Sequence, residues 1–131
     1  GDSNQFTLNC GTLLTSCSNV EITETAVGNL NTVSQTIKGQ NIKSTLGITG
    51  SSNQVTTNIS QSNSTSNISI TGDANNVNST MNAVGGTGST LDISILGGSN
   101  TVLTTQGGSI DSTVKLQVTG TSNNITVHTS N

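Results

Sequence analysis

Gly50-Ser51-Ser52-Asn53-Gln54-Val55 is one of six copies of the same hexamer in this chain. Written as Gly-x-x-Asn-x-apolar, the hexamer begins at Gly1, Gly28, Gly50, Gly72, Gly97 and Gly120. Repetition at a period of about 20 to 50 residues is typical of repeat architectures, in which each repeat is one structural unit. The 22 residues from Gly50 to Gly72 define the most regular interval, so the sequence predicts one stacked unit of about that length per copy.

Each hexamer opens a run in which inward and outward residues alternate. After Asn53, for example, Val55, Thr57 and Ile59 are predicted to point inward, and the residues between them are predicted to point outward. A second alternating run ends at the next glycine. Before Gly72, for example, Ile68 and Ile70 are the predicted inward residues. Period-two alternation is the pattern of a half-buried β-strand. The predicted core residues are Val33, Val55, Val77, Val102 and Ile125 in the first runs, and Ile48, Ile70, Ile95 and Val118 in the second runs.

These two runs per repeat predict an all-β fold, a β-solenoid of about six stacked two-strand coils with 22-residue repeats, as a single domain over residues 1–131. A β-sandwich is the competing fold, but nothing in a sandwich requires its strands to repeat in sequence. Glu24 breaks the inward apolar pattern. Two interpretations of it remain open: Glu24 turns outward at a local bulge, or it lies at a polar end of the core.

The turn into each first strand has constant length, and its glycine and asparagine are the predicted turn and ladder residues. Glycine permits a positive φ, and asparagine tolerates the left-handed conformation or forms an amide ladder between layers. The pairs are Gly28 and Asn31, Gly50 and Asn53, Gly72 and Asn75, Gly97 and Asn100, and Gly120 and Asn123. Insertions fall in the other turn, at 85–88, 106–109 and 10–17, so we expect loops along one edge only.

The composition argues against several classes of partner. The basic residues are Lys38, Lys43 and Lys115, and the net charge is −3, so we expect no nucleic-acid partner. No apolar run reaches transmembrane length, so we expect no membrane insertion. The chain opens directly on a repeat, as a processed mature protein would. Cys10 and Cys17 are either a small-loop disulfide, which implies an oxidising extracytoplasmic setting, or two free buried thiols.

Few residues are candidates for catalysis, and we expect no enzyme activity, no cofactor and no metal site. The acidic residues fall on different layers of the predicted stack, whereas a general acid and base must face one cleft. His128 is the only histidine and lies on the outward face of the last strand. An outward threonine row is predicted from Thr25, Thr49, Thr71 and Thr119, broken by Leu96. Such a row suggests ice binding as a minor alternative.

The repeat resembles that of curlin, the major subunit of curli fibres. The resemblance covers the chain from Gly1 to the strand ending near Thr129, in the period, the two-strand repeat and the turn Gly followed by Asn, as in Gly50 and Asn53. The chain departs from curlin in having Gly-x-x-Asn followed by Val or Ile, and few regularly placed glutamines such as Gln35. The resemblance implies a stacked-coil fold that assembles into an extracellular, amyloid-like fibre.

The ends of the predicted stack are strands without a covering element, and such edges invite pairing with another chain. The chain has no proline, and it finishes on a first strand that lacks its second-strand partner. We therefore predict a structural protein that assembles with itself, head to tail, into an extracellular filament. The predicted assembly interface is Asn4, Phe6, Leu8, Ile125 and Val127. The alternatives are a virion component, such as a phage fibre or decoration, and an ice- or glycan-binding module.

Overall fold

The computed structural model describes residues 1–11, 17–82, 89–107 and 112–130. Eleven strands make up its regular structure, and the described residues include no helix. The first strands of the repeats are β1 (Gln5–Cys10), β3 (Thr32–Ile37), β5 (Gln54–Ile59), β7 (Asn76–Met81), β9 (Thr101–Gln106) and β11 (Asn124–Thr129). The second strands are β2 (Glu21–Val27), β4 (Lys43–Thr49), β6 (Ser64–Thr71), β8 (Ser89–Leu96) and β10 (Ser112–Thr119).

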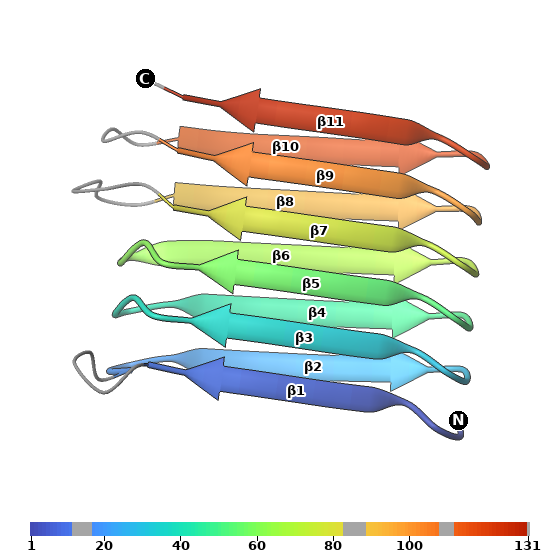
Figure 1. The fold of residues 1–131 in the computed structure, drawn as a ribbon, viewed down its shortest axis with the longest axis horizontal. Coiled ribbons are helices and arrows are strands. Elements are labelled where there is room, and N and C mark those ends of the chain that lie inside the picture. Colours follow the sequence, from blue (N-terminus) through green and yellow to red (C-terminus); the bar gives the residue numbers. More distant parts are fainter. Residues whose placement is uncertain (12–16, 83–88, 108–111, 131) are drawn as a thin grey trace.

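The odd-numbered strands form a six-stranded sheet in the order β1-β3-β5-β7-β9-β11, and the even-numbered strands form a five-stranded sheet in the order β2-β4-β6-β8-β10. All neighbours are parallel, and equivalent residues of successive repeats pair directly, as Val55 does with Val33 and Val77. The chain therefore winds as a β-solenoid, in which five coils are followed by the lone strand β11 (Figure 1). The predicted fold is confirmed, and the β-sandwich is excluded.

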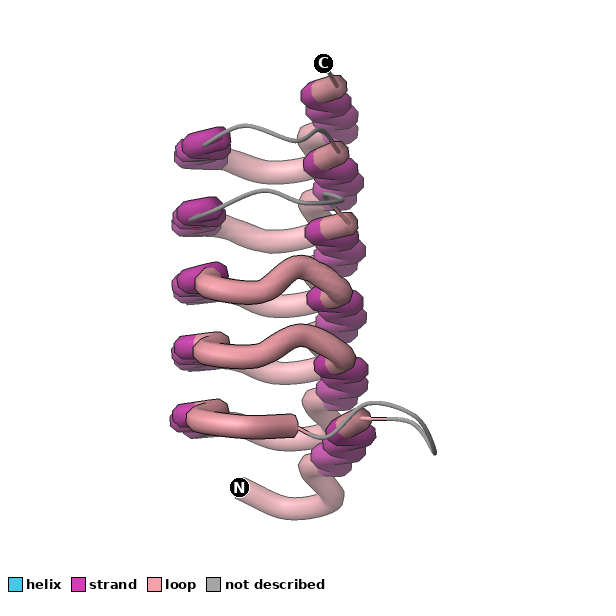
Figure 2. Tube along the Cα trace, turned by 90° about the vertical axis from the view of Figure 1, so that its left-hand side faces the viewer, coloured by secondary structure: helices cyan, strands magenta, loops and turns pink. Residues whose placement is uncertain are grey.

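The core is a thin layer between the two sheets, which face each other along the whole stack (Figure 2). Every predicted core residue is buried except Ile125, which is half-buried because no further coil covers β11. Polar side chains share the inward rows: Gln35, Thr57 and Ser79 are all buried. The Ser44 hydroxyl donates to Gln35 Oε1 across the core at 2.9 Å. Small polar residues therefore fill positions where a thick globular core would need large apolar ones.

The Gly-x-x-Asn corner is regular in every coil, but its left-handed residue is not the asparagine. The residue before the asparagine has the left-handed φ, as in Ser52 (59°) and Ala74 (57°). Gly72 has a φ of 131°, and a Cβ at this position would collide with the carbonyl oxygen of Gly97 in the next coil. The glycine is thus required both by its backbone conformation and by the close approach of successive coils.

Glu24 keeps its inward position on β2, which is the end strand of the five-stranded sheet. It pairs in register with the buried Leu46 of β4. No bulge interrupts the pairing of β2 with β4, so the open question from the sequence is settled: Glu24 lies at a polar end of the core. The predicted loops at 85–88 and 108–109, and Leu13 and Leu14, fall outside the described residues.

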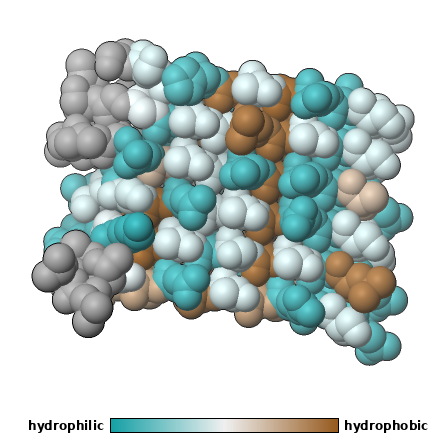
Figure 3. Space-filling view, in the orientation of Figure 1, coloured by the Kyte–Doolittle hydropathy of each residue, from teal (hydrophilic) through white to brown (hydrophobic). Residues whose placement is uncertain are grey.

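The outer faces of the sheets are largely polar, as the face of the six-stranded sheet shows (Figure 3). On the five-stranded sheet the predicted threonine row is wrong at its first member. Thr25 pairs with Gly47, whereas Val27 pairs with Thr49. The row therefore reads Val27, Thr49, Thr71, Leu96 and Thr119, with two apolar members. A row interrupted in this way does not favour an ice-binding lattice.

Candidate functional site

The most regular polar feature is a ladder of asparagine side chains at the Gly-x-x-Asn corner, which we call the inner amide ladder. Its members are Asn4, Asn31, Asn53, Asn75, Asn100 and Asn123, and the four central ones are buried. In each step Nδ2 donates to Oδ1 of the preceding asparagine at 2.9 to 3.0 Å. The backbone N–H donates to the same oxygen, and Nδ2 also donates to a glycine carbonyl of the next coil, as in Asn53 to Gly72 at 2.9 Å.

The inner amide ladder has a direction, because every bond between its side chains runs the same way. At the last coil, no described residue donates to Oδ1 of Asn123, and its Nδ2 has only a 3.5 Å contact with Thr119 O. At the first coil, Asn4 Nδ2 donates to Gly28 O at 2.9 Å and to no other described residue. One end of the stack therefore presents an unused amide acceptor, and the other end presents unused amide donors.

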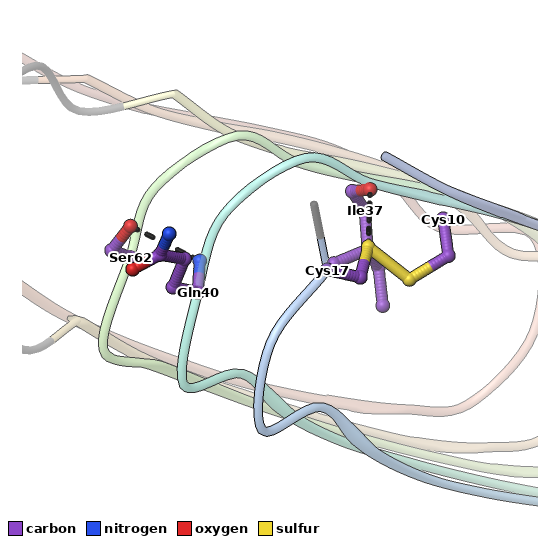
Figure 4. Close-up of a disulfide and its surroundings, with 5 residues drawn as sticks. All are labelled: Cys10, Cys17, Ile37, Gln40 and Ser62. Carbon is purple, nitrogen blue, oxygen red and sulfur yellow. Dashed lines mark hydrogen bonds between the residues drawn. A yellow bond between two sulfur atoms is a disulfide. The ribbon is translucent and has the colours of Figure 1, made fainter. Parts of the chain in front are cut away.

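A second ladder lies at the opposite corner and was missed from the sequence. This outer amide ladder joins Asn19 to Asn41 at 3.2 Å and Asn41 to Asn63 at 2.8 Å, and all three residues are exposed. Each of the three has a left-handed φ between 53° and 55°. Their spacing of 22 residues is the signal that identifies them. The opposite corner is thus also regular across the first three coils, as the bond from Gln40 N to Ser62 Oγ illustrates (Figure 4).

The predicted interface residues lie at the two ends of shared rows. Pairing in register aligns Phe6 with Val33 at the first coil and Ile125 with Val102 at the last, and these residues belong to one row. Leu8 and Val127 end the neighbouring row in the same way. Phe6 is 44% exposed and Leu8 47% exposed, although both occupy inward positions. Each end of the stack therefore exposes apolar end members of the inward rows.

The first corner carries the Cys10–Cys17 disulfide that the sequence suggested, and the described residues include no free cysteine. Cys10 is the last residue of β1, and Cys17 precedes β2. The sulfur of Cys17 also contacts the carbonyl oxygen of Ile37 in the second coil at 3.4 Å (Figure 4). The covalent link thus closes the turn of the first coil and lies against the coil above it.

The described residues offer little for catalysis. They line no pocket, and no group of His, Cys, Asp or Glu among them has the arrangement of a metal site. Their one recorded ion pair joins Lys43 Nζ to Glu21 Oε1 at 3.7 Å, and both side chains are exposed. Burial raises the pKa of Glu24, whose Oε1 is buried without a hydrogen-bond donor. The candidate site is therefore not a cleft but the pair of open ends.

Comparison with known proteins adds no family to these observations. No protein-family model matches the chain, and no significant match is found among curated proteins. Within the described ranges, no helix has the length and apolar character needed to cross a membrane. The function must therefore be inferred from the geometry of the stack and its ends.

Proposed function

We propose that this chain is a structural protein that assembles with itself, head to tail, into an extracellular, curli-like filament with a cross-β spacing. The observation that carries the proposal is the direction of the inner amide ladder. A second copy placed on the last coil brings its Asn4 backbone N–H and Nδ2 to the unused Oδ1 of Asn123. In return, Asn123 Nδ2 reaches the Gly1 carbonyl of that copy, as every other ladder asparagine reaches a glycine of the next coil.

The same placement continues both inward rows across the junction, where the end members of each row are apolar. Phe6 of the added copy follows Ile125, and its Leu8 follows Val127, because each pair already ends one row. The contact buries four side chains that are exposed or half-buried in the single chain. Burial of apolar area contributes about 25 cal/mol per Å², so the junction gains hydrophobic stabilisation in addition to the backbone hydrogen bonds of β11 with β1.

The two strands that meet in this junction lack the features that keep edge strands apart. Proteins block exposed edges with charged residues, proline or a covering element. Neither β1 (QFTLNC) nor β11 (NITVHT) contains Lys, Arg, Asp, Glu or proline. The contact is heterologous, since different surfaces of the two copies meet, and repetition of such a contact propagates as a filament.

An extracellular location is part of the proposal and is supported by two observations. A disulfide joins Cys10 to Cys17, and such bonds persist in oxidising environments outside the cytoplasm. The resemblance of the repeat to curlin points in the same direction.

A concentration series tests the proposal directly. Purified chain is followed by sedimentation and electron microscopy from micromolar to millimolar concentration, at neutral and at mildly acidic pH. We expect filaments whose diffraction shows a spacing of about 4.8 Å along the axis. A strictly monomeric chain under all of these conditions would contradict the proposal. Detection of the native protein in purified virus particles rather than in free filaments would favour a virion component instead.

A pair of substitutions on β11 sharpens this test. Val127→Lys places a charge in an inward row at the end of the stack, whereas His128→Lys places one on the outward face of the same strand. We expect Val127→Lys to abolish filaments while the circular dichroism of the monomer is retained, and His128→Lys to assemble normally. Equal assembly by both variants would show that β11 is not in the junction.

A further inference from the structure

The two sheets contain unequal numbers of strands, and this difference has a consequence for the junction. The six-stranded sheet ends at β11, which lies beyond β10, the last strand of the five-stranded sheet (Figure 1). In the head-to-tail contact proposed above, β1 of the next copy follows β11. In the other sheet, the strand position directly after β10 is then empty, and β2 of the added copy occupies the position after that. Strands lie about 4.8 Å apart, so β10 and β2 face each other across roughly 10 Å, with one strand missing.

One inward row of the five-stranded sheet ends at this gap in both copies, at β10 of one copy and at β2 of the other. The row consists of Glu24, Leu46, Ile68, Ile93 and Leu116, as the pairing of the five-stranded sheet shows. Leu46 and Ile93 are buried, and Leu116 at the last coil is half-buried. The Glu24 carboxylate of one copy therefore faces Leu116 of its neighbour across the missing strand position, in an otherwise apolar row.

Among the residues that the structure describes, no charged group of opposite sign faces this carboxylate. On its own strand and on β4, Glu21 and Lys43 pair with each other on the outer face. On the opposing end, Lys115 of β10 and His128 of β11 are exposed on outward faces. Neither β1 nor β3 contains an ionisable acid or base apart from the bonded Cys10. An ionised Glu24 that enters the junction thus loses water without gaining a partner, which disfavours the charged form.

We propose that a second copy of this chain docks at the end of the stack that carries β2, and that the negative charge of Glu24, which faces the junction there, opposes this docking. The inference rests on the proposed head-to-tail assembly. An inward-pointing charge on an end strand is one of the devices by which proteins keep exposed sheet edges from pairing. Here the device is reversible, because protonation removes the charge and leaves a carboxylic acid that fits the same space.

The sign of the pH effect follows from burial. Burial already raises the pKa of Glu24 in the single chain, and docking removes more water from it, so the docked form binds the proton more tightly. Assembly must then strengthen as the pH falls toward the ordinary glutamate range near about 4.3. The association constant for one junction rises by at most about tenfold per pH unit, because one proton is taken up per junction.

The test compares two glutamates that are three residues apart on β2. Glu24→Gln removes the inward charge, and Glu21→Gln removes the same net charge from the outer face of the same strand. We expect Glu24→Gln to assemble at pH 7 at a concentration at least about tenfold below that of the unmodified chain, and to lose most of the pH dependence. Glu21→Gln should follow the unmodified chain. Glu24→Leu, which completes the apolar row, should assemble at least as well as Glu24→Gln.

The outcomes separate this inference from the function on which it rests. If no variant forms filaments at any pH, the proposed assembly is overturned. If filaments form but Glu24→Gln keeps the pH dependence of the unmodified chain, only the role of Glu24 is overturned. If Glu21→Gln and Glu24→Gln promote assembly equally, net charge rather than the inward position controls assembly, and the role of Glu24 is again overturned. Circular dichroism of the monomeric fraction monitors folding of every variant.

Discussion

The inner and outer amide ladders are built from the same side chain at the same spacing, yet they occupy different environments. Asn53 of the inner ladder is 1% exposed, its Oδ1 accepts two hydrogen bonds and its Nδ2 donates two. Asn41 of the outer ladder is exposed, and its side chain makes one bond to each neighbouring asparagine. The inner ladder satisfies a buried corner, whereas the outer ladder lies where water can replace either bond.

The comparison shows that the asparagines are used for different properties. Inner asparagines are selected for side-chain hydrogen bonds, because the left-handed conformation of that corner falls on the residue before them. Outer asparagines adopt the left-handed conformation themselves, which asparagine tolerates better than most residues. Substitutions that separate burial, bonding and backbone conformation therefore test the comparison.

The largest effect is expected where the inner corner is tightest. Gly72→Ala places a Cβ against the Gly97 carbonyl and forces alanine to adopt a φ of 131°. We expect a loss of more than about 4 kcal/mol in the free energy of unfolding, measured by denaturant titration. Gly47→Ala is the matched control, because its Cβ would meet no atom within 4 Å, and it should be nearly neutral. Similar losses for both would refute the corner as the cause.

Removal of one inner amide should have the next largest effect. Asn53→Ala leaves the Nδ2 and backbone N–H of Asn75 without their acceptor and interrupts the inner amide ladder in the middle. We expect the free energy of unfolding to fall by about 3 kcal/mol, since buried groups remain unpaired. A fall below about 1 kcal/mol would mean that water enters the corner and replaces the amide.

The Thr57→Val substitution tests whether a buried hydroxyl without a hydrogen-bond partner lowers the free energy of unfolding. Thr57 is fully buried in the row between Gln35 and Ser79, and its hydroxyl has no recorded partner. Replacement of the hydroxyl by a methyl group of similar size should raise the free energy of unfolding by about 1 kcal/mol. The reverse change on the same strand, Val55→Thr, should lower it. A loss of stability in Thr57→Val would indicate a buried water bound to the hydroxyl.

The smallest effect is expected in the outer ladder. Asn41→Gly removes two exposed side-chain bonds but retains a residue suited to the left-handed conformation. We expect a change within about 0.5 kcal/mol in a thermal or denaturant unfolding experiment. A loss approaching that of Asn53→Ala would show that the two ladders contribute equally and would remove the distinction drawn between them.

The solenoid could be predicted from the sequence because its repeats carry the same residues at the same inward positions. A glycine, an asparagine and an apolar residue recur in every coil, as at Gly50, Asn53 and Val55, so the register of each coil on the next can be read from the sequence. The outer amide ladder was missed because the residues around Asn19, Asn41 and Asn63 do not repeat. Counting back from the glycine also gives the threonine row, and this count places Val27 rather than Thr25 opposite Thr49.

The end of the stack was less predictable than its middle, for a physical reason. Inward positions of the middle strands are covered by coils on both sides, and none of them carries a charged residue, so the alternating pattern is simple to interpret there. At an end strand the same position is only partly covered, and a charged residue such as Glu24 is tolerated there. The pattern alone therefore could not distinguish a bulge at Glu24 from an inward side chain at the edge of the core.

The Cys10–Cys17 disulfide makes the two ends of the molecule unequal as starting points for unfolding. In a stacked chain each coil is held mainly by its neighbours, so loss of order begins at an end and passes inward one coil at a time. The first coil is tied by a covalent link that also contacts Ile37 of the second, whereas β11 pairs with β9 on one side and has no such link. The chain should therefore unfold coil by coil from its C-terminal end, and reduction of the disulfide should allow unfolding to begin at both ends.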